Sequence, residues 1–176
     1  VQTLSRFYPQ ATIEAVEVSD IVINLAKTYF DFSENERMII HQADGADFIE
    51  KQLNEKTKTY DIIVLDAFDG DYIPKHLRSE QFLARLKGLM TPQGIVAANV
   101  FAYRSDYKLQ KALFSRQFRH VVIGSHQICS NHIFFGSEQP LEISSRNLES
   151  QQDFLEKFHQ LEVQTQLMTF VQRDRA

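Results

Sequence analysis

Residues 60–71 read YDIIVLDAFDGD, an apolar run that ends in a cluster of acidic side chains. A short run with apolar residues on both faces is typical of a strand in a parallel sheet that is covered on both sides. A second fully apolar run, GIVAANVF (94–101), follows the helix-like segment SEQFLARLKGLM (79–90) and the turn-like TPQG. A strand, a helix and another strand in this order predict a parallel sheet flanked by helices.

The same alternation extends toward the start of the chain. The β-branched segment TIEAVEV predicts a buried strand, and Ser19 or Asp20 then caps an amphipathic helix. A further strand, MIIHQAD, precedes the helix-like ADFIEKQLNE. These predicted elements span 12–18 (strand), 19–30 (helix), 38–44 (strand) and 46–55 (helix).

The last third of the chain has a different pattern. A helix near 105–116 leads to two strand-like runs, 119–127 and 131–138, whose short link predicts an antiparallel pair. Residues 147–161 predict a polar helix with one apolar stripe, and 162–173 fit a helix or a strand. We therefore expect an α/β fold with a doubly wound, mostly parallel sheet and an antiparallel edge pair.

The length, net charge and cysteine content of the chain bear on its domain number, its partners and its cellular compartment. The 176 residues suit a single domain over 1–176, and a formal net charge of −4 leaves no excess of cations for a nucleic-acid partner. No apolar run reaches the length of a membrane span, and the first residues do not resemble a signal peptide. The single cysteine, Cys129, predicts a reduced thiol, so we expect a soluble, cytoplasmic protein.

Three acidic residues follow or end predicted strands, where ligands bind in doubly wound sheets. Glu17 has two oxygens that can accept both hydroxyls of a ribose, although an exposed charge at a strand end is an equal alternative. Asp44 can accept from an adenine amino group while Gly45 lets the ring approach, and Asp44 can also cap the helix that follows. Asp66 ends the most apolar strand, where a carboxylate is costly unless it serves a site.

Two more carboxylates, Asp69 and Asp71, crowd the loop after Asp66 and would repel it unless a cation binds there. A bound amine and a metal are both such cations. The six histidines are scattered and form no cluster with metal-ligand spacing, so we expect no metal site. No serine has the Gly-x-Ser-x-Gly setting of acyl-transfer hydrolases.

The segments AVEVSDIVINLAKTYF, QADGADF, YDIIVLDAFDGDYIPKHL and LMTPQGIVAANVF resemble, in this order, the spermidine synthase family of polyamine aminopropyltransferases, which has a class I methyltransferase-like, Rossmann-like fold. The resemblance implies that Glu17, with Val18, binds the ribose of decarboxylated S-adenosylmethionine and that Asp44 and Gly45 bind its adenine. It implies a catalytic base at Asp66. It also implies a homodimer and a polyamine substrate held by Asp69. Asp71 and Tyr72 lie in the same acidic loop and are further candidates for binding that substrate.

The resemblance also marks departures from the family pattern. Ala67, Phe68 and Gly70 stand where the family has Ser, Ser and Pro, and no glycine precedes Glu17, so the family's first strand and glycine-rich loop are missing. Because Val1, Leu4 and Phe7 have helical spacing without a cap, we expect the chain to be a fragment truncated at its N-terminus.

These departures leave two alternatives open. A methyltransferase that uses S-adenosylmethionine would need Glu17 and Asp44 but not the carboxylate pair Asp66 and Asp69. The changed loop after Asp66 and the missing glycine-rich loop also fit a non-catalytic homologue that binds a ligand or a partner.

Overall fold

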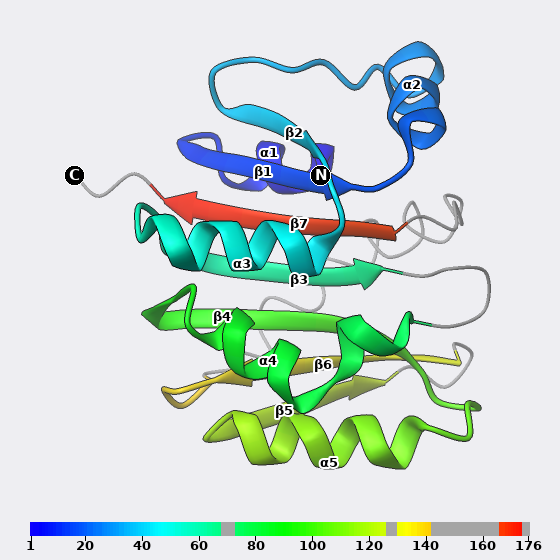
Figure 1. The fold of residues 1–176 in the computed structure, drawn as a ribbon, viewed down its shortest axis with the longest axis vertical. Helices are drawn as coiled ribbons and strands as arrows, with labels where there is room; N and C mark the ends of the chain where they lie inside the picture. The colour runs from blue at the N-terminus through cyan, green and yellow to red at the C-terminus, as the bar shows by residue number, and fades with distance from the viewer. Residues whose placement is uncertain (68–72, 126–129, 142–165, 174–176) are drawn as a thin grey trace.

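The computed structural model describes residues 1–67, 73–125, 130–141 and the strand 166–173. The predicted helix at 147–161 lies outside these residues. Helices and strands alternate as expected through the first two thirds of the chain (Figure 1). The elements are α1 (Gln2–Phe7), β1 (Ala11–Glu17), α2 (Asp20–Tyr29), β2 (Met38–Gln42), α3 (Gly45–Glu55), β3 (Tyr60–Ala67), the 3-10 helix η1 (Lys75–Arg78), α4 (Glu80–Lys87), β4 (Met90–Phe101), α5 (Tyr107–Gln117), β5 (His120–Ser125), β6 (Asn131–Ser137) and β7 (Gln166–Arg173).

The described strands form one 7-stranded sheet in the order β2-β1-β7-β3-β4-β6-β5. β1 pairs with β2 and β3 pairs with β4 in parallel, whereas β6 is antiparallel to both β4 and β5. Strands β1 to β5 therefore point in one direction, and β6 and β7 point in the other. The predicted α/β fold with an antiparallel edge pair is confirmed.

The sequence pattern of residues 162–173 fits a helix or a strand. In the structure, Gln166–Arg173 form the strand β7, which lies in the middle of the sheet. β7 is antiparallel to β1 on one side and to β3 on the other (Figure 1). Val171 is opposite Ile13 of β1 and also opposite Ile62 of β3. The backbone of β7 thus joins the β2–β1 pair to the other four strands.

The prediction of a turn at TPQG, followed by a strand that begins at residue 94, was wrong. The four residues lie inside β4, which begins at Met90. The register between β3 and β4 shifts there, because Tyr60 pairs with Met90 while Ile62 pairs with Ile95. The extra residues form a bulge in the strand, a feature that local turn propensity does not distinguish from a turn.

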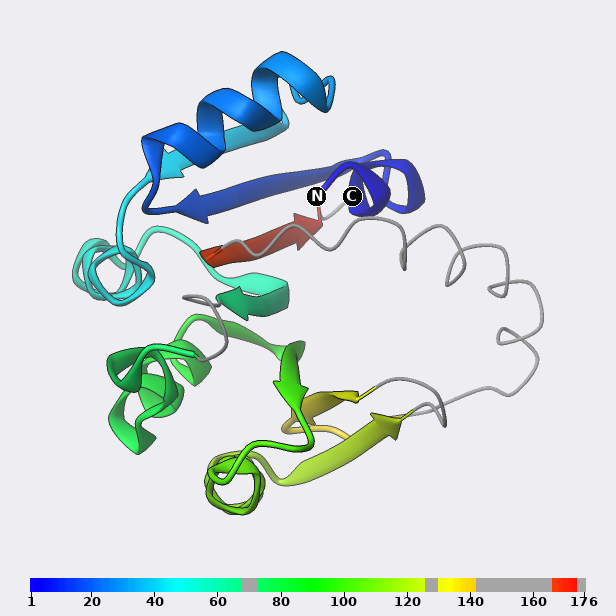
Figure 2. The same cartoon turned by 90° about the vertical axis from the view of Figure 1, so that its right-hand side faces the viewer.

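Helices cover the sheet unequally. Figure 2 shows α3, α4 and α5 on one side and the short α1 on the other. Beneath the three helices lies the main core, which includes Ile63, Leu65, Val96 and Phe134. A smaller cluster on the α1 side contains Ala11, Ile13 and Met38. Successive side chains of a strand alternate between these two faces.

The amphipathic α2 forms as predicted, and Ser19 caps it by accepting a hydrogen bond from the backbone N–H of Val22. Its apolar stripe, however, is not buried against the described part of the chain. Ile21 is 66% exposed and Tyr29 is 73% exposed. Figures 1 and 2 place α2 beside the β2 edge of the sheet, so helical periodicity predicted the helix but not what covers it.

A buried carboxylate links β1, β2 and the start of β3. Glu14 of β1 is 1% exposed. Its Oε2 lies 2.7 Å from His41 Nε2, and its Oε1 accepts hydrogen bonds from Lys58 Nζ (2.7 Å) and the Tyr60 hydroxyl (3.4 Å). Burial, followed by the charge of Glu14, raises the pKa of Tyr60. Both oxygens of Glu14 are partnered, so this acid has a structural role.

We expect Glu14→Ala to destabilise the fold by about 2 kcal/mol, because it removes charge-assisted hydrogen bonds from a buried position while Lys58 and His41 can still reach water. The free energy of unfolding in urea measures this change. Glu55→Ala, which removes the exposed i,i+4 partner of Lys51, is the control and should cost less than about 0.5 kcal/mol. Equal losses in the two variants would contradict a structural role for Glu14.

Candidate functional site at the carboxyl ends of the strands

The carboxyl ends of β1 and β3 lie at the same edge of the sheet (Figure 1). Glu17 is the last residue of β1, and Asp66 is the next-to-last residue of β3. Asp44 follows β2 and lies close to the end of β1, because the Ala43 N–H donates to the Glu17 carbonyl at 3.1 Å. The predicted Asp69, Asp71 and Tyr72 lie outside the described residues.

Glu17 and Asp66 lie on the two strands that flank β7, opposite the same residue of β7. Asp66 is opposite Leu167, and Val16 is opposite Met168, so the register places Glu17 opposite Leu167 as well. The two acids are thus separated by two strand spacings, about 10 Å. By alternation from Ile13 and Ile62, which belong to the smaller cluster, both side chains are on the α1 face.

Glu17 is buried, and only one of its two carboxylate oxygens has a hydrogen-bond partner among the described residues. Its side chain is not the exposed charge that was the alternative, since Glu17 is 3% exposed. Oε1 accepts a hydrogen bond from the Ser19 N–H at 2.8 Å, whereas the buried Oε2 has no partner among the described residues. Burial raises the pKa of Glu17, and backbone hydrogen bonds from Ser19 and Val18 oppose the rise. Such an orphaned acceptor is expensive unless a ligand donates to it.

Asp44 has two partners. Its Oδ1 accepts from the Ala46 N–H at 2.8 Å, which confirms the predicted cap of α3, and its Oδ2 lies 2.9 Å from His76 Nε2. Gly45 is buried as the first residue of α3. His76, on η1, was not singled out from the sequence, because the chain places it 32 residues from Asp44.

Asp66 is held by a neighbour on the adjacent strand. The Asn99 amide of β4 donates from Nδ2 to Asp66 Oδ1 at 3.0 Å, and Oδ2 accepts no hydrogen bond from the described part of the chain. Burial raises the pKa of Asp66, and the Asn99 hydrogen bond opposes the rise. Sequence reasoning missed Asn99, although it is the one polar side chain in GIVAANVF and could have been noticed for that reason.

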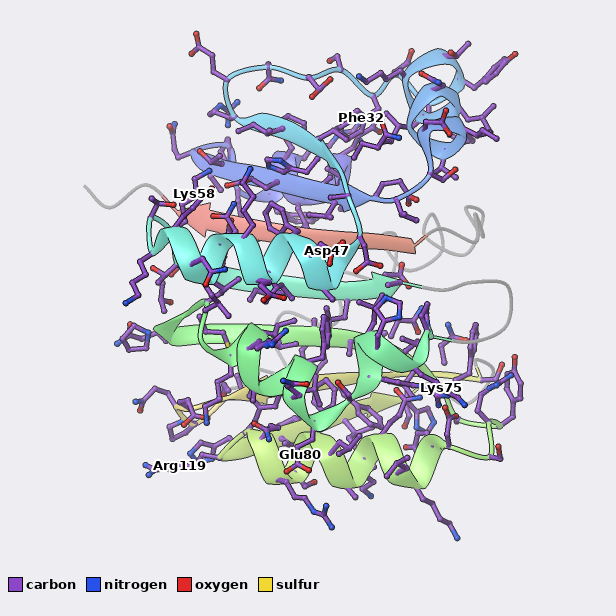
Figure 3. All side chains as sticks on the ribbon, viewed as in Figure 1. Phe32, Asp47, Lys58, Lys75, Glu80 and Arg119 are labelled. Atoms are coloured by element: carbon purple, nitrogen blue, oxygen red, sulfur yellow. The ribbon has the colours of Figure 1, made fainter. Side chains whose placement is uncertain are left out.

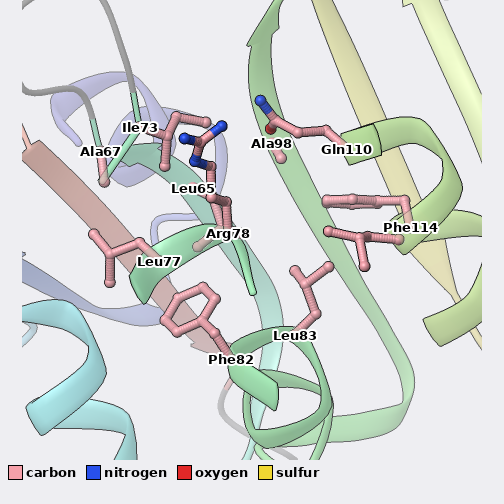
Figure 4. A pocket seen from close by; sticks show the side chains of 11 residues that line it. Leu65, Ala67, Ile73, Leu77, Arg78, Phe82, Leu83, Ala98, Gln110 and Phe114 are labelled. Carbon is pink, nitrogen blue, oxygen red and sulfur yellow. The ribbon is translucent and has the colours of Figure 1, made fainter. Parts of the chain in front are cut away.

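A small cavity of about 20 Å³ lies on the opposite face, between the strand ends and the helices (Figure 4). Its lining is mainly apolar, with Arg78 and Gln110 as the polar exceptions. Arg78 forms an ion pair with Asp106. A volume of this size holds about one water molecule, so the cavity is a gap in packing and not a substrate pocket.

A larger polar depression of about 280 Å³ is lined by residues such as Gln52, Thr57 and Lys58. Figure 3 shows Lys58 at the edge of the sheet opposite from Lys75, so this depression is far from the strand ends that carry the acids. Among the described residues, no group of three or more His, Cys, Asp or Glu side chains could hold a metal ion. No helix in the described ranges is long and apolar enough to span a membrane.

Comparison with known proteins gives the family. The family model described as the spermine/spermidine synthase domain matches residues 3–124, a range that contains Glu17, Asp44, Asp66 and Asn99. The chain belongs to the spermine/spermidine synthase domain family. The predicted resemblance is confirmed.

The relatives of this synthase-domain chain include two kinds of transferase. A polyamine aminopropyltransferase of Vibrio vulnificus is 34% identical over 115 residues, which cover 65% of this chain and 38% of the relative. An eEF1A lysine and N-terminal methyltransferase of Bos taurus is 32% identical over 100 residues, which cover 53% of this chain and 14% of the relative. The synthase-domain chain therefore matches less than half of each of these relatives.

Solved structures share the fold. Human methyltransferase-like protein 13, in a complex with SAH, superposes with a TM-score of 0.74 at 23% identity, covering 92% of this chain and 77% of that one. A spermidine synthase in complex with the transition-state analogue AdoDATO superposes with a TM-score of 0.60 at 19% identity, covering 81% and 59%. Both superpositions confirm the predicted fold class, which is Rossmann-like and methyltransferase-like.

We expect Glu17→Gln to stabilise the unliganded fold by about 1 kcal/mol at pH 7, because it removes a buried charge. The pKa of Glu17 is raised on folding, so the stability of the parent chain falls as pH rises through that pKa. The advantage of the variant should therefore vanish at acid pH, where Glu17 is protonated.

Urea denaturation at pH 4 and pH 7 measures both differences. Glu36→Gln, at an exposed acid, is the control and should change stability little at either pH. A loss of stability in Glu17→Gln at pH 7 would show that the charge of Glu17 has an internal partner.

Proposed function

We propose that this chain belongs to an aminopropyltransferase, which moves the aminopropyl group of decarboxylated S-adenosylmethionine to a diamine, and that it carries the nucleoside-binding site and the catalytic base. The observation that carries the proposal is the half-satisfied, buried Glu17 standing level with Asp66 at the carboxyl edge of the sheet. Membership of the spermine/spermidine synthase domain family supports the same class of reaction.

The free Oε2 of Glu17 fits the ribose of such a nucleoside. A carboxylate only accepts, and a ribose offers two hydroxyl donors, so a bound ribose would satisfy the oxygen that the fold leaves without a partner. Val18 follows Glu17 directly and would border the same ligand. Binding would also favour the ionised form of Glu17, because hydrogen bonds to a carboxylate lower its pKa.

Asp44 and Gly45 would receive the adenine. The carboxylate of Asp44 can accept from the exocyclic amino group, and the absence of a side chain at Gly45 lets the ring approach the backbone. His76 lies against Asp44 Oδ2, so an adenine amino group would share that oxygen with His76 or displace it. The His76 side chain is half-exposed, so it can bond to water if the adenine takes its place.

Asp66 would act as the base. When bound, the sulfonium of the nucleoside supplies a carbon that an amine can attack, with departure of methylthioadenosine. The amine nitrogen forms the new C–N bond, the C–S bonding pair stays on sulfur, and Asp66 Oδ2 accepts the proton that the nitrogen loses. The separation of about 10 Å between the strands that carry Glu17 and Asp66 suits a ligand that reaches from its ribose to its reactive end.

Asp69, Asp71 and Tyr72 would hold the cationic amine next to Asp66. The proposal rests on their place in the sequence, directly after β3, and on the attraction of carboxylates for an ammonium group. A formal net charge of −4 favours the approach of a polycation. We also propose that the protein forms a homodimer, which its resemblance to the spermidine synthase family implies.

Methyl transfer from S-adenosylmethionine is the second candidate. It is favoured by the eEF1A methyltransferase relatives and by the likeness to human methyltransferase-like protein 13. Glu17 and Asp44 would serve both nucleosides equally. The difference lies at the reactive end, where S-adenosylmethionine carries an additional carboxylate that the acids after β3 would repel.

Calorimetric titration of the chain with 5′-methylthioadenosine and with S-adenosylhomocysteine separates the two candidates. We expect methylthioadenosine to bind at least about tenfold more tightly, since it lacks the carboxylate. The Glu17→Gln variant should lose most of this affinity. A preference for S-adenosylhomocysteine would favour methyl transfer instead.

Asp66→Asn should lower the rate of aminopropyl transfer to putrescine by at least about a hundredfold, because an amide cannot accept the proton. The binding of methylthioadenosine should be unchanged, since the Asn side chain has the same shape and can still accept from Asn99. Product formation by mass spectrometry and calorimetry measure the two quantities.

Asp61→Asn is the matched control for this variant. Asp61 lies on the same strand as Asp66 but at its amino end, where it accepts a hydrogen bond from Thr91 at 2.9 Å. Its substitution should leave transfer intact. Loss of nucleoside binding in Asp66→Asn would contradict the assignment of Asp66 as a base.

A further inference from the structure

A row of three polar side chains crosses the sheet at the candidate site. Asn99 Nδ2 donates to Asp66 Oδ1 at 3.0 Å, and Asn131 Nδ2 donates to Asn99 Oδ1 at 2.9 Å. The residues come from β3, β4 and β6, which are neighbours in the sheet. Leu65 and Ala98, which precede Asp66 and Asn99, belong to the main core, and so does Phe134, three residues after Asn131 on β6. Alternation therefore places the row on the other face, the face of Asp66 and Glu17.

The order of donors in this row follows from the chemistry of its members. An ionised carboxylate can only accept, so Asn99 must turn its NH₂ group toward Asp66. The carbonyl of Asn99 then faces β6, where a donor is needed to hold it. Asn131 supplies that donor. If the Asn99 amide turned over, its carbonyl oxygen would face the carboxylate and repel it.

We propose that Asn131 is a positioning residue for the transfer reaction: it holds the Asn99 amide in the one orientation that donates to Asp66, which leaves Asp66 Oδ2 directed at the amine. This role rests on the proposed function of Asp66 as the base. Asn131 touches neither Asp66 nor the proposed ligand in this scheme, and it acts through Asn99.

The hydrogen bond from Asn99 opposes the effect of burial on the Asp66 carboxyl. Burial raises the pKa of Asp66, and the Asn99 hydrogen bond lowers it. A comparison between variants isolates the contribution of the asparagine row.

The test is a double-mutant cycle on Asn99 and Asn131, read by the carbon-13 NMR titration of the Asp66 carboxyl in the whole chain. Asn99→Ala should raise the pKa of Asp66, because the carboxylate loses its donor. Asn131→Ala should raise it less, since Asn99 stays but is free to turn over. The double variant should match Asn99→Ala alone, because Asn131 acts only through Asn99.

Thr91→Val is the matched control, because it removes the other cross-strand hydrogen bond from β4 to an aspartate of β3, at the opposite end of the strands. It should not move the titration of Asp66. An unchanged titration in Asn131→Ala, or effects of the two asparagines that simply add, would overturn the proposal. This readout needs no turnover, so it decides the role of Asn131 even if the proposed transfer fails.

Activity gives an independent readout. At neutral pH, Asn99→Ala should lower kcat for aminopropyl transfer roughly tenfold and Asn131→Ala a few-fold, with KM for the nucleoside unchanged. Both losses should shrink as pH rises, because Asp66 then ionises without help. Asn131→Ser offers a hydroxyl donor and should restore part of the rate. A loss that does not depend on pH would indicate a merely structural effect and contradict the proposal.

Discussion

The pairing of β7 with both β1 and β3 is the constraint on which the arrangement of the site depends. β1 and β3 are not paired with each other in the sheet, and the backbone of β7 between them sets their register and their separation. That register places Glu17 and Asp66 opposite the same residue, Leu167. A slip of one residue on either side of β7 would turn one acid to the other face of the sheet, because side chains alternate along a strand.

The two buried glutamates of β1, Glu14 and Glu17, show that the burial of an acid does not by itself indicate a functional site. Glu14 is 1% exposed and has partners for both of its oxygens, contributed by β2, β3 and the segment between α3 and β3. Glu17 is 3% exposed and has a partner for one oxygen only. The desolvation of Glu14 is offset within the fold, whereas that of Glu17 is offset only when a donor arrives from outside. This difference separates a structural acid from a ligand-binding one.

Two opposing effects act on the ionisation of the Asp66 carboxyl group. Its burial favours the neutral acid, and the row of Asn99 and Asn131 favours the ionised base. A base that receives a proton from an amine benefits from such a balance, because a carboxylate stabilised too strongly would be a poor acceptor. The polar row gives a role to Asn99, the one polar side chain in the stretch GIVAANVF (94–101) of β4.

The sequence by itself determined the kind and order of nearly all described elements, the family, and the three acids near the strand ends. These features are local, since they depend on periodicities of two or 3.6 residues and on short motifs around Glu17, Asp44 and Asp66. Only the tertiary structure decided that β7 enters the sheet between β1 and β3, that TPQG lies inside β4, and that the apolar stripe of α2 is exposed. It also decided the partners of Glu14 and the row from Asp66 to Asn131. These contacts join residues far apart in the chain, and no local pattern records which distant strand lies beside another or which oxygen is left without a donor.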